Sequence, residues 1–162
     1  MHTKKHVNIA IIGKYVDLKD AYKSLDEALT HGGISNKVKV NLIRIESDKL
    51  KPNQIAKKLK NISGLLIPGG FGKRGTEGKI TAIKYARERK IPFLGICFGM
   101  QMAIIEFARN KLKIKKAGST ELDRNCYPVV GLINEWNKDG KIIRGTDKDL
   151  GGTMRLGLYM RY

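Results

Sequence analysis

The chain has 162 residues, enough for one domain with a sizeable core, and its 41% hydrophobic and 29% charged residues are typical of a globular protein. The formal net charge is +17, but the 23 lysines and 9 arginines are scattered and their densest runs, 57–60 and 111–116, contain no aromatic residue, so nucleic-acid binding is not expected. Two cysteines exclude a disulfide scaffold and fit a cytoplasmic setting. No stretch is apolar enough to span a membrane, and no metal site is expected.

The spacing of apolar residues predicts strands and helices that alternate along the chain. Strands are expected over 7–12, 38–45, 62–67 and 91–96, and helices over 17–33, 51–61, 77–90 and 98–109. The first helix should turn Leu25, Ala28 and Leu29 inward and stop at Gly32. This alternation implies a mostly parallel sheet covered by helices on both faces. In such a sheet the active crevice lies at the carboxyl ends of the strands.

One cysteine stands between two glycines at a predicted junction of strand and helix. Cys97 follows a strand expected to be buried, and Gly95 and Gly99 flank it at two residues on either side. This is the G-x-nucleophile-x-G elbow, with sulfur in place of the serine oxygen. The positive end of the following helix should favour the thiolate. The alternative is a buried structural cysteine.

A second glycine-rich stretch, PGGFGKRG at 68–75, also follows a predicted strand, so it should lie beside Cys97. Attack of a thiolate on an amide or ester carbonyl creates an oxyanion, which backbone N–H groups must stabilise. The N–H of Phe98 can be one donor, and a loop such as Gly69–Gly70 can supply another. The alternative is a tight turn that needs glycine.

The segment at 68–101, PGGFGKRGTEGKITAIKYARERKIPFLGICFGMQ, resembles the carboxyl-terminal glutaminase domain of the CTP synthase family, a class I glutamine amidotransferase. So do VDLKDAYKSLDEAL, AGSTELD, YPVVGLINEW and DLGGTMRLG. The resemblance implies a flavodoxin-like three-layer fold, with a glutamine amidotransferase domain over 1–157 and a tail at 158–162 outside the family pattern. It also implies release of ammonia from L-glutamine for amination of UTP to CTP, in pyrimidine nucleotide biosynthesis.

The resemblance assigns roles to individual residues. Cys97 would be the nucleophile, with the amides of Gly70 and Phe98 as the oxyanion hole. The glutamine-binding residues would be Gly70, Phe98, Gly99, Met100, Gln101 and Glu121. Phe71 and Arg144, the latter expected in a loop, would respond to the activator GTP. No cofactor is implied for this domain, whereas a synthase domain, as partner, would use ATP and Mg²⁺.

The histidine base and its glutamate partner, which the family carries beyond GGTMRLG, have no counterpart here. The histidines are His2, His6 and His31, and all precede Cys97. The chain is therefore expected to be a truncated fragment, weakly active or inactive, and whether it is an enzyme by itself is left open. The alternatives are a non-catalytic module that binds glutamine or a partner, another thiol hydrolase or chaperone-like protein, and a basic nucleic-acid binder. His31, near the end of the first predicted helix, is the candidate substitute base.

Overall fold

The computed structural model describes residues 5–14, 21–131, 135–138 and 140–144. The chain divides into two compact units, Met1–Val130 and Gly131–Tyr162. The first predicted helix is described only from residue 21, and the predicted tail at 158–162 lies outside the described residues. Among the helices described, none is long and apolar enough to cross a bilayer.

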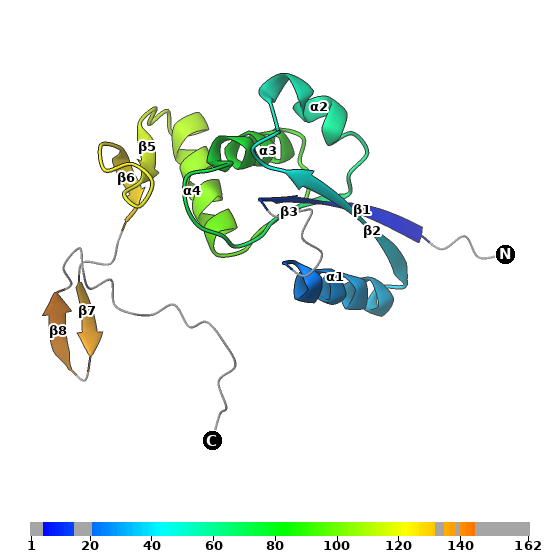
Figure 1. The fold of residues 1–162 in the computed structure, drawn as a ribbon, viewed down its shortest axis with the longest axis horizontal. Helices are drawn as coiled ribbons and strands as arrows, with labels where there is room; N and C mark the ends of the chain where they lie inside the picture. Colours follow the sequence, from blue (N-terminus) through cyan, green and yellow to red (C-terminus); the bar gives the residue numbers. More distant parts are fainter. Residues whose placement is uncertain (1–4, 15–20, 132–134, 139, 145–162) are drawn as a thin grey trace. The chain divides into compact units, whose positions relative to one another are not determined.

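The first unit is built on a four-stranded parallel sheet in the order β2-β1-β3-β4 (Figure 1). Its strands are β1 (Lys5–Gly13), β2 (Val38–Glu46), β3 (Gly64–Ile67) and β4 (Phe93–Gly95). β1 pairs with β2 on one side and β3 on the other, and β3 pairs with β4. This order is that of flavodoxin-like folds, so the predicted fold class is confirmed.

Helices cover both faces of this sheet. In Figure 1, α1 (Lys23–Ser35) lies on one side, and α3 (Thr76–Glu88) and α4 (Phe98–Asn110) lie on the other. The predicted helix over 51–61 is shorter than expected and consists of η1 (Pro52–Gln54) and α2 (Ile55–Lys58). A small parallel pair, β5 (Ala117–Ser119) and β6 (Tyr127–Val130), packs against α4.

The core lies between the sheet and the helices α3 and α4. The apolar positions read from the helical spacing of α4 are all buried: Phe98, Met102, Ile105 and Ala108. Ile80 and Ile83 of α3 are buried as well. They pack with strand residues such as Ile12, Leu65 and Ile67 in one cluster. Burial of these side chains fixes where α4 begins, and so where Cys97 lies.

Two expectations for α1 are wrong. The helix does not stop at Gly32 but continues to Ser35, where the backbone and side-chain amides of Asn36 donate to the Gly32 carbonyl and the Lys37 N–H donates to that of Ile34. Ala28 is exposed, and the only buried residue of the helix is Gly33, where a Cβ would meet the side chain of Val40. Close approach to β2, and not helix termination, explains Gly33.

The strand before Cys97 was expected to be buried, and this is also wrong for β4 in the described part of the chain. β4 pairs there with β3 alone, so it forms one edge of the sheet. Leu94 is 55% exposed and Phe93 is 36% exposed. The apolar run reads as buried, but an edge strand covered by α4 on one side leaves part of its side chains outside.

The second unit contains a two-stranded antiparallel hairpin, β7 (Glu135–Lys138) and β8 (Lys141–Arg144). Its turn includes Gly140, whose φ of +78° suits glycine. Arg144, expected in a loop, lies in β8, because each residue of 141–144 pairs with one of 135–138 across the hairpin. Its guanidinium Nε donates to the Glu135 carboxylate at 3.2 Å.

Candidate functional site

Three segments that follow strands meet at the carboxyl edge of the sheet. Lys14 follows β1, the loop 68–72 follows β3, and Cys97 follows β4. The chain reverses its direction of progress across the sheet between β1 and β3, and such a switch point is where ligands bind in open parallel sheets. The sequence prediction that the glycine loop and the cysteine are neighbours is confirmed, since a Cβ on Gly69 would lie 3.6 Å from the Cβ of Cys97.

Cys97 has the backbone conformation of a nucleophile elbow. Its φ is +52° and its ψ is −106°, a region that L residues rarely adopt. Both flanking glycines are required by close packing. A Cβ on Gly95 would lie 2.7 Å from the Gly99 carbonyl carbon, and one on Gly99 would collide with the Ile67 carbonyl oxygen. The strand can therefore turn directly into α4, which leaves the thiol exposed at the tip.

The two backbone amides expected to form an oxyanion hole are available. Within the described residues, neither the Phe98 N–H nor the Gly70 N–H has a hydrogen-bond acceptor. The Phe98 N–H is at the start of α4, where a helix leaves its first amides unpaired. An unpaired donor beside an exposed thiol is what a developing negative charge needs.

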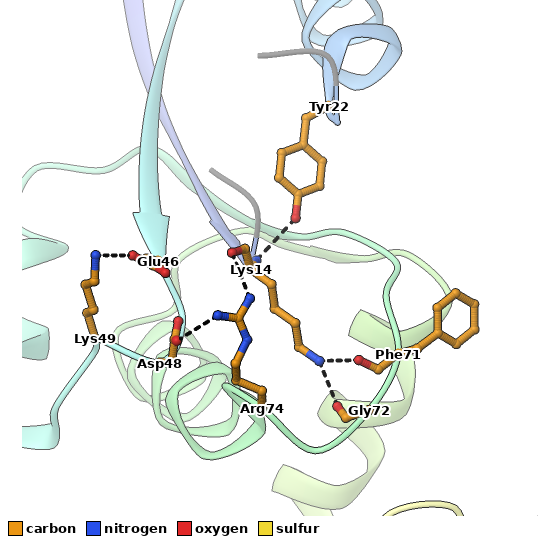
Figure 2. Close-up of polar contacts among 8 residues, drawn as sticks. All are labelled: Lys14, Tyr22, Glu46, Asp48, Lys49, Phe71, Gly72 and Arg74. Carbon is orange, nitrogen blue, oxygen red and sulfur yellow. Dashed lines mark hydrogen bonds and ion pairs between the residues drawn. The ribbon is translucent and has the colours of Figure 1, made fainter. Parts of the chain in front are cut away.

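The Lys14 side chain holds the backbone of the glycine loop (Figure 2). Its ammonium donates to the carbonyl oxygens of Phe71 and Gly72, the latter at 2.8 Å. Arg74 donates to the Lys14 carbonyl and forms an ion pair with Asp48 at 3.3 Å. Burial is the main cause that lowers the pKa of Lys14, and the nearby Arg74 adds to it. The carbonyls of this loop are thus turned toward a cation, which fixes its backbone.

A second lysine lies buried beside the same loop. Lys79 of α3 is 1% exposed, and its ammonium is 4.8 Å from the centroid of the Phe98 ring. A Cβ on Gly70 would lie 3.9 Å from that ammonium. Burial, with a smaller effect of Lys14, lowers the pKa of Lys79 to about 8. Sequence reasoning missed both lysines, although Lys79 shares the helical face of Ile83 and Ala86, a position that signals burial.

Two of the predicted glutamine-binding residues lie close to the elbow. Gln101 is one turn into α4, and its N–H donates to the Cys97 carbonyl at 3.2 Å. Among the residues that the structure describes, its buried side-chain oxygen has no hydrogen-bond partner, so it can accept a hydrogen bond from a ligand. Glu121 is exposed, and its negative charge acts on Lys14, which places it near the glycine loop.

The other predicted residues have different surroundings. Gly99 is packed against β3, and Met100 is 53% exposed and lines an apolar groove on α4 with Ile104 and Phe107. The Phe71 ring is 56% exposed and points away from Lys14 (Figure 2). Their roles in binding glutamine or GTP stay predictions, as does that of Arg144 in the second unit.

The structure places the described histidines away from Cys97. His6 is near the amino end of β1, roughly 23 Å from the carboxyl edge at ~3.3 Å per residue. His31 is near the end of α1, two residues before Gly33, which packs on Val38 and Val40 at the amino end of β2. Neither described histidine can therefore serve as the base for Cys97.

A pocket of about 340 Å³ adjoins the elbow and is lined by Tyr22, Leu25, Pro68, Gly69 and Ile96, among others. It has room for a small ligand beside Ile96, the residue that precedes the cysteine. Among the described residues no group of three or more His, Cys, Asp or Glu side chains could hold a metal ion.

A parallel α/β sheet with a strained cysteine elbow, and with amides that are unpaired within the described residues, has the geometry that thiol-dependent acyl transfer requires. The chain belongs to the class I glutamine amidotransferase family, whose model, Glutamine amidotransferase class-I, matches residues 17–161. Its relatives point to one branch of that family. It is 77% identical over 159 residues to a CTP synthase of Pelagibacter ubique, covering 98% of this chain and 30% of that protein.

Two further comparisons agree. A CTP synthase of Zymomonas mobilis is 56% identical over 94% of this chain and 29% of its own length. The Trypanosoma brucei CTPS glutaminase domain with bound acivicin superposes with a TM-score of 0.70 at 34% identity, covering 75% of this chain and 48% of that one. The resemblance drawn from the motifs is confirmed, and the chain spans about 30% of the length of these curated relatives.

Proposed function

We propose that this chain carries the glutaminase chemistry of CTP synthesis, with Cys97 as its nucleophile. The observation that supports this most is the elbow itself: a φ of +52° at an exposed cysteine, held by two glycines that tolerate no Cβ. Ordinary structural cysteines do not need such strain. The similarity to CTP synthases over 98% of the chain supports the choice of substrate.

In the proposed reaction the Cys97 thiolate attacks the side-chain amide carbon of L-glutamine. The C–S bond forms, the carbonyl oxygen becomes an oxyanion, and the amides of Phe98 and Gly70 donate to it. Collapse of this intermediate expels ammonia once its nitrogen is protonated and leaves a γ-glutamyl thioester. Water then releases glutamate and restores the thiol. Gln101 and Glu121 would hold the amino-acid end of the substrate.

Protonation of ammonia and activation of water both need an acid–base group. The 162 residues contain no histidine after Cys97, and the described ones are distant from it. We therefore propose that the base, with its carboxylate partner, comes from outside these residues. A synthase domain would receive the ammonia, using ATP and Mg²⁺ to activate UTP, and GTP would act as activator. Absence of a base favours a second candidate, a module that binds glutamine without turning it over.

Covalent labelling with acivicin tests the proposal. The purified chain is incubated with the compound in the presence and absence of L-glutamine, and modified peptides are identified by mass spectrometry. We expect modification of Cys97, slowed by L-glutamine but not by D-glutamine, and none in Cys97→Ala. Modification that ignores L-glutamine would contradict a glutamine site at the elbow. L-glutamine could protect Cys97 while the chain, extended by the segment that follows it in the Pelagibacter ubique CTP synthase, releases no ammonia. That result would favour the module that binds glutamine without turning it over.

A further inference from the structure

Lys79 is in an environment that ordinarily excludes a charged lysine. It is 1% exposed, it lies in the first turn of α3, where the helix dipole is positive, and Lys14 is nearby. In the described part of the chain its ammonium has no hydrogen-bond acceptor and no acidic partner. A methionine of similar length could fill the same space without these costs. The ammonium therefore calls for a reason beyond packing.

The ammonium contacts the two segments that carry the free amides. It lies 4.8 Å from the centroid of the Phe98 ring, within the range of a cation–π interaction. It is also the nearest neighbour of Gly70, at 3.9 Å from the Cβ position. The Lys14 ammonium is 5.6 Å from the same ring and bonds the next two carbonyls of the loop, those of Phe71 and Gly72. The two lysines thus join the glycine loop to the first residue of α4.

We propose that Lys79 is a positioning residue of the Cys97 site. Its ammonium, held by the Phe98 ring, fixes the Gly70 amide relative to the Phe98 amide and places next to the elbow a positive charge that no described carboxylate pairs with. The proposal rests on the proposed function, since both the thiolate and the oxyanion of that reaction are negative. A buried charge is weakly screened, so it acts on them more strongly than a surface lysine does. The lack of an acidic partner for Lys79 among the described residues fits this role, because a carboxylate would cancel the field.

The reactivity of Cys97 toward two alkylating reagents tests this without any glutamine turnover. Iodoacetate is an anion and iodoacetamide is neutral, so the ratio of their rates at one thiol reports the local potential. The ratio is measured at pH 7 by peptide mass spectrometry in the whole chain, with Cys126 as internal reference. The variants are Lys79→Met, Lys79→Arg and Phe98→Leu. Lys84→Met is the matched control, since Lys84 is an exposed lysine of the same helix.

We expect the iodoacetate-to-iodoacetamide ratio at Cys97 to fall about threefold or more in Lys79→Met. It should stay near the wild-type value in Lys79→Arg and Lys84→Met, and the ratio at Cys126 should not change. In Phe98→Leu, which keeps the backbone amide but loses the ring, the ratio should fall as well. A ratio that is unchanged in a folded Lys79→Met, or that falls equally in Lys84→Met, would overturn the proposal.

Folding of each variant is checked by circular dichroism. If Lys79→Met does not fold, Phe98→Leu decides: a lowered ratio supports the proposal, and an unchanged ratio contradicts it. Failure of this proposal is distinguishable from failure of the proposed function. In one outcome, L-glutamine slows acivicin labelling of Cys97, but the iodoacetate-to-iodoacetamide ratio is the same in Lys79→Met and wild type. The proposed glutaminase site would then stand, and only the role of Lys79 would be rejected.

Discussion

The Lys79 ammonium and the Phe98 ring, 4.8 Å apart, connect the helix α3 to the residue that follows the cysteine elbow. The loop 69–72 runs over this pair, with a Cβ on Gly70 3.9 Å from the ammonium. One cation therefore lies against both segments that supply unpaired amides near Cys97. Its burial without an acidic partner in the described residues opposes folding, and this has a measurable consequence.

The stability of the protein should rise with pH through the titration of Lys79. Its pKa is lowered by burial to about 8 from 10.5, so between these values the folded state has lost a proton that the unfolded chain still binds. The free-energy cost of burying the charged ammonium is complete below pH 8. Deprotonation above pH 8 relieves this cost and raises the free energy of unfolding by up to about 3 kcal/mol. Urea unfolding at pH 7 and pH 10 measures the gain.

Lys79→Met should be more stable than the wild type at pH 7 and should lose this part of the pH slope. The charged groups near the site, Lys14, Asp48, Arg74 and Glu121, are the same in both proteins, so the difference isolates Lys79. Lys84→Met serves as control. Equal slopes in Lys79→Met and wild type would show that Lys79 is not the titrating group.

The two cysteines should differ in reactivity. Cys97 is exposed at the elbow, whereas Cys126 is partly buried against Gly118. We expect iodoacetamide at neutral pH to modify Cys97 at least about tenfold faster, because the thiol is accessible and lies at a helix N-terminus. Peptide mass spectrometry gives both rates from one sample. Equal rates would mean that the elbow does not activate its thiol.

Gly99→Ala should destabilise the fold by about 1–3 kcal/mol or prevent folding, because the new Cβ would collide with the Ile67 carbonyl. Gly32→Ala is the matched control. It also lies inside a helix, but nothing lies within 4 Å of its Cβ position, so it should stabilise by up to about 1 kcal/mol. Thermal unfolding compares them. An unchanged unfolding temperature in Gly99→Ala would contradict the close packing of the elbow.

The ion pair between α3 and α4 should support the position of the elbow. The Arg87 guanidinium donates to both oxygens of Glu106, which is 1% exposed, with its shortest bond at 2.8 Å. Glu106→Gln should cost about 2 kcal/mol, since it removes the buried partner of Arg87 and leaves the guanidinium only the exposed Glu88 carboxylate, 3.9 Å away. Glu77→Gln, which removes an exposed partner of Arg109, should cost less than about 1 kcal/mol. Urea unfolding at pH 7 measures the free energy of unfolding of both variants. Similar losses of stability would contradict the claim that the buried pair contributes more than the exposed one.

Sequence reasoning found the features of this protein that depend on local chemistry. The elbow needs Cys97 between two glycines, and the core face of α4 has helical spacing, so both could be read directly from the sequence. The parallel direction of the strands in the sheet could be predicted from their alternation with helices. Each of these properties depends on residues that are close together in the sequence.

Features that depend on distant packing were missed. Lys79 and Lys14 belong to the scattered lysines to which the sequence assigned no role, and only the tertiary fold brings both to the Phe98 ring. The exposure of β4 depends on which strands pair with it, and Gly33 is explained by the approach of β2. Arg144 was expected in a loop, because the pairing with Glu135 across the hairpin is not visible in a single segment.

Ammonia release from L-glutamine tests the central claim, that Cys97 is a glutaminase nucleophile that needs a base from outside these 162 residues. Three proteins are compared: this chain, the chain extended by the segment that follows it in the Pelagibacter ubique CTP synthase, and the extended chain with Cys97→Ala. Acid–base help is worth ~10²–10⁴-fold, so we expect the extension to raise the rate by at least about 100-fold and Cys97→Ala to abolish it. Equal turnover by the chain with and without the extension, or turnover that survives Cys97→Ala, would contradict the account.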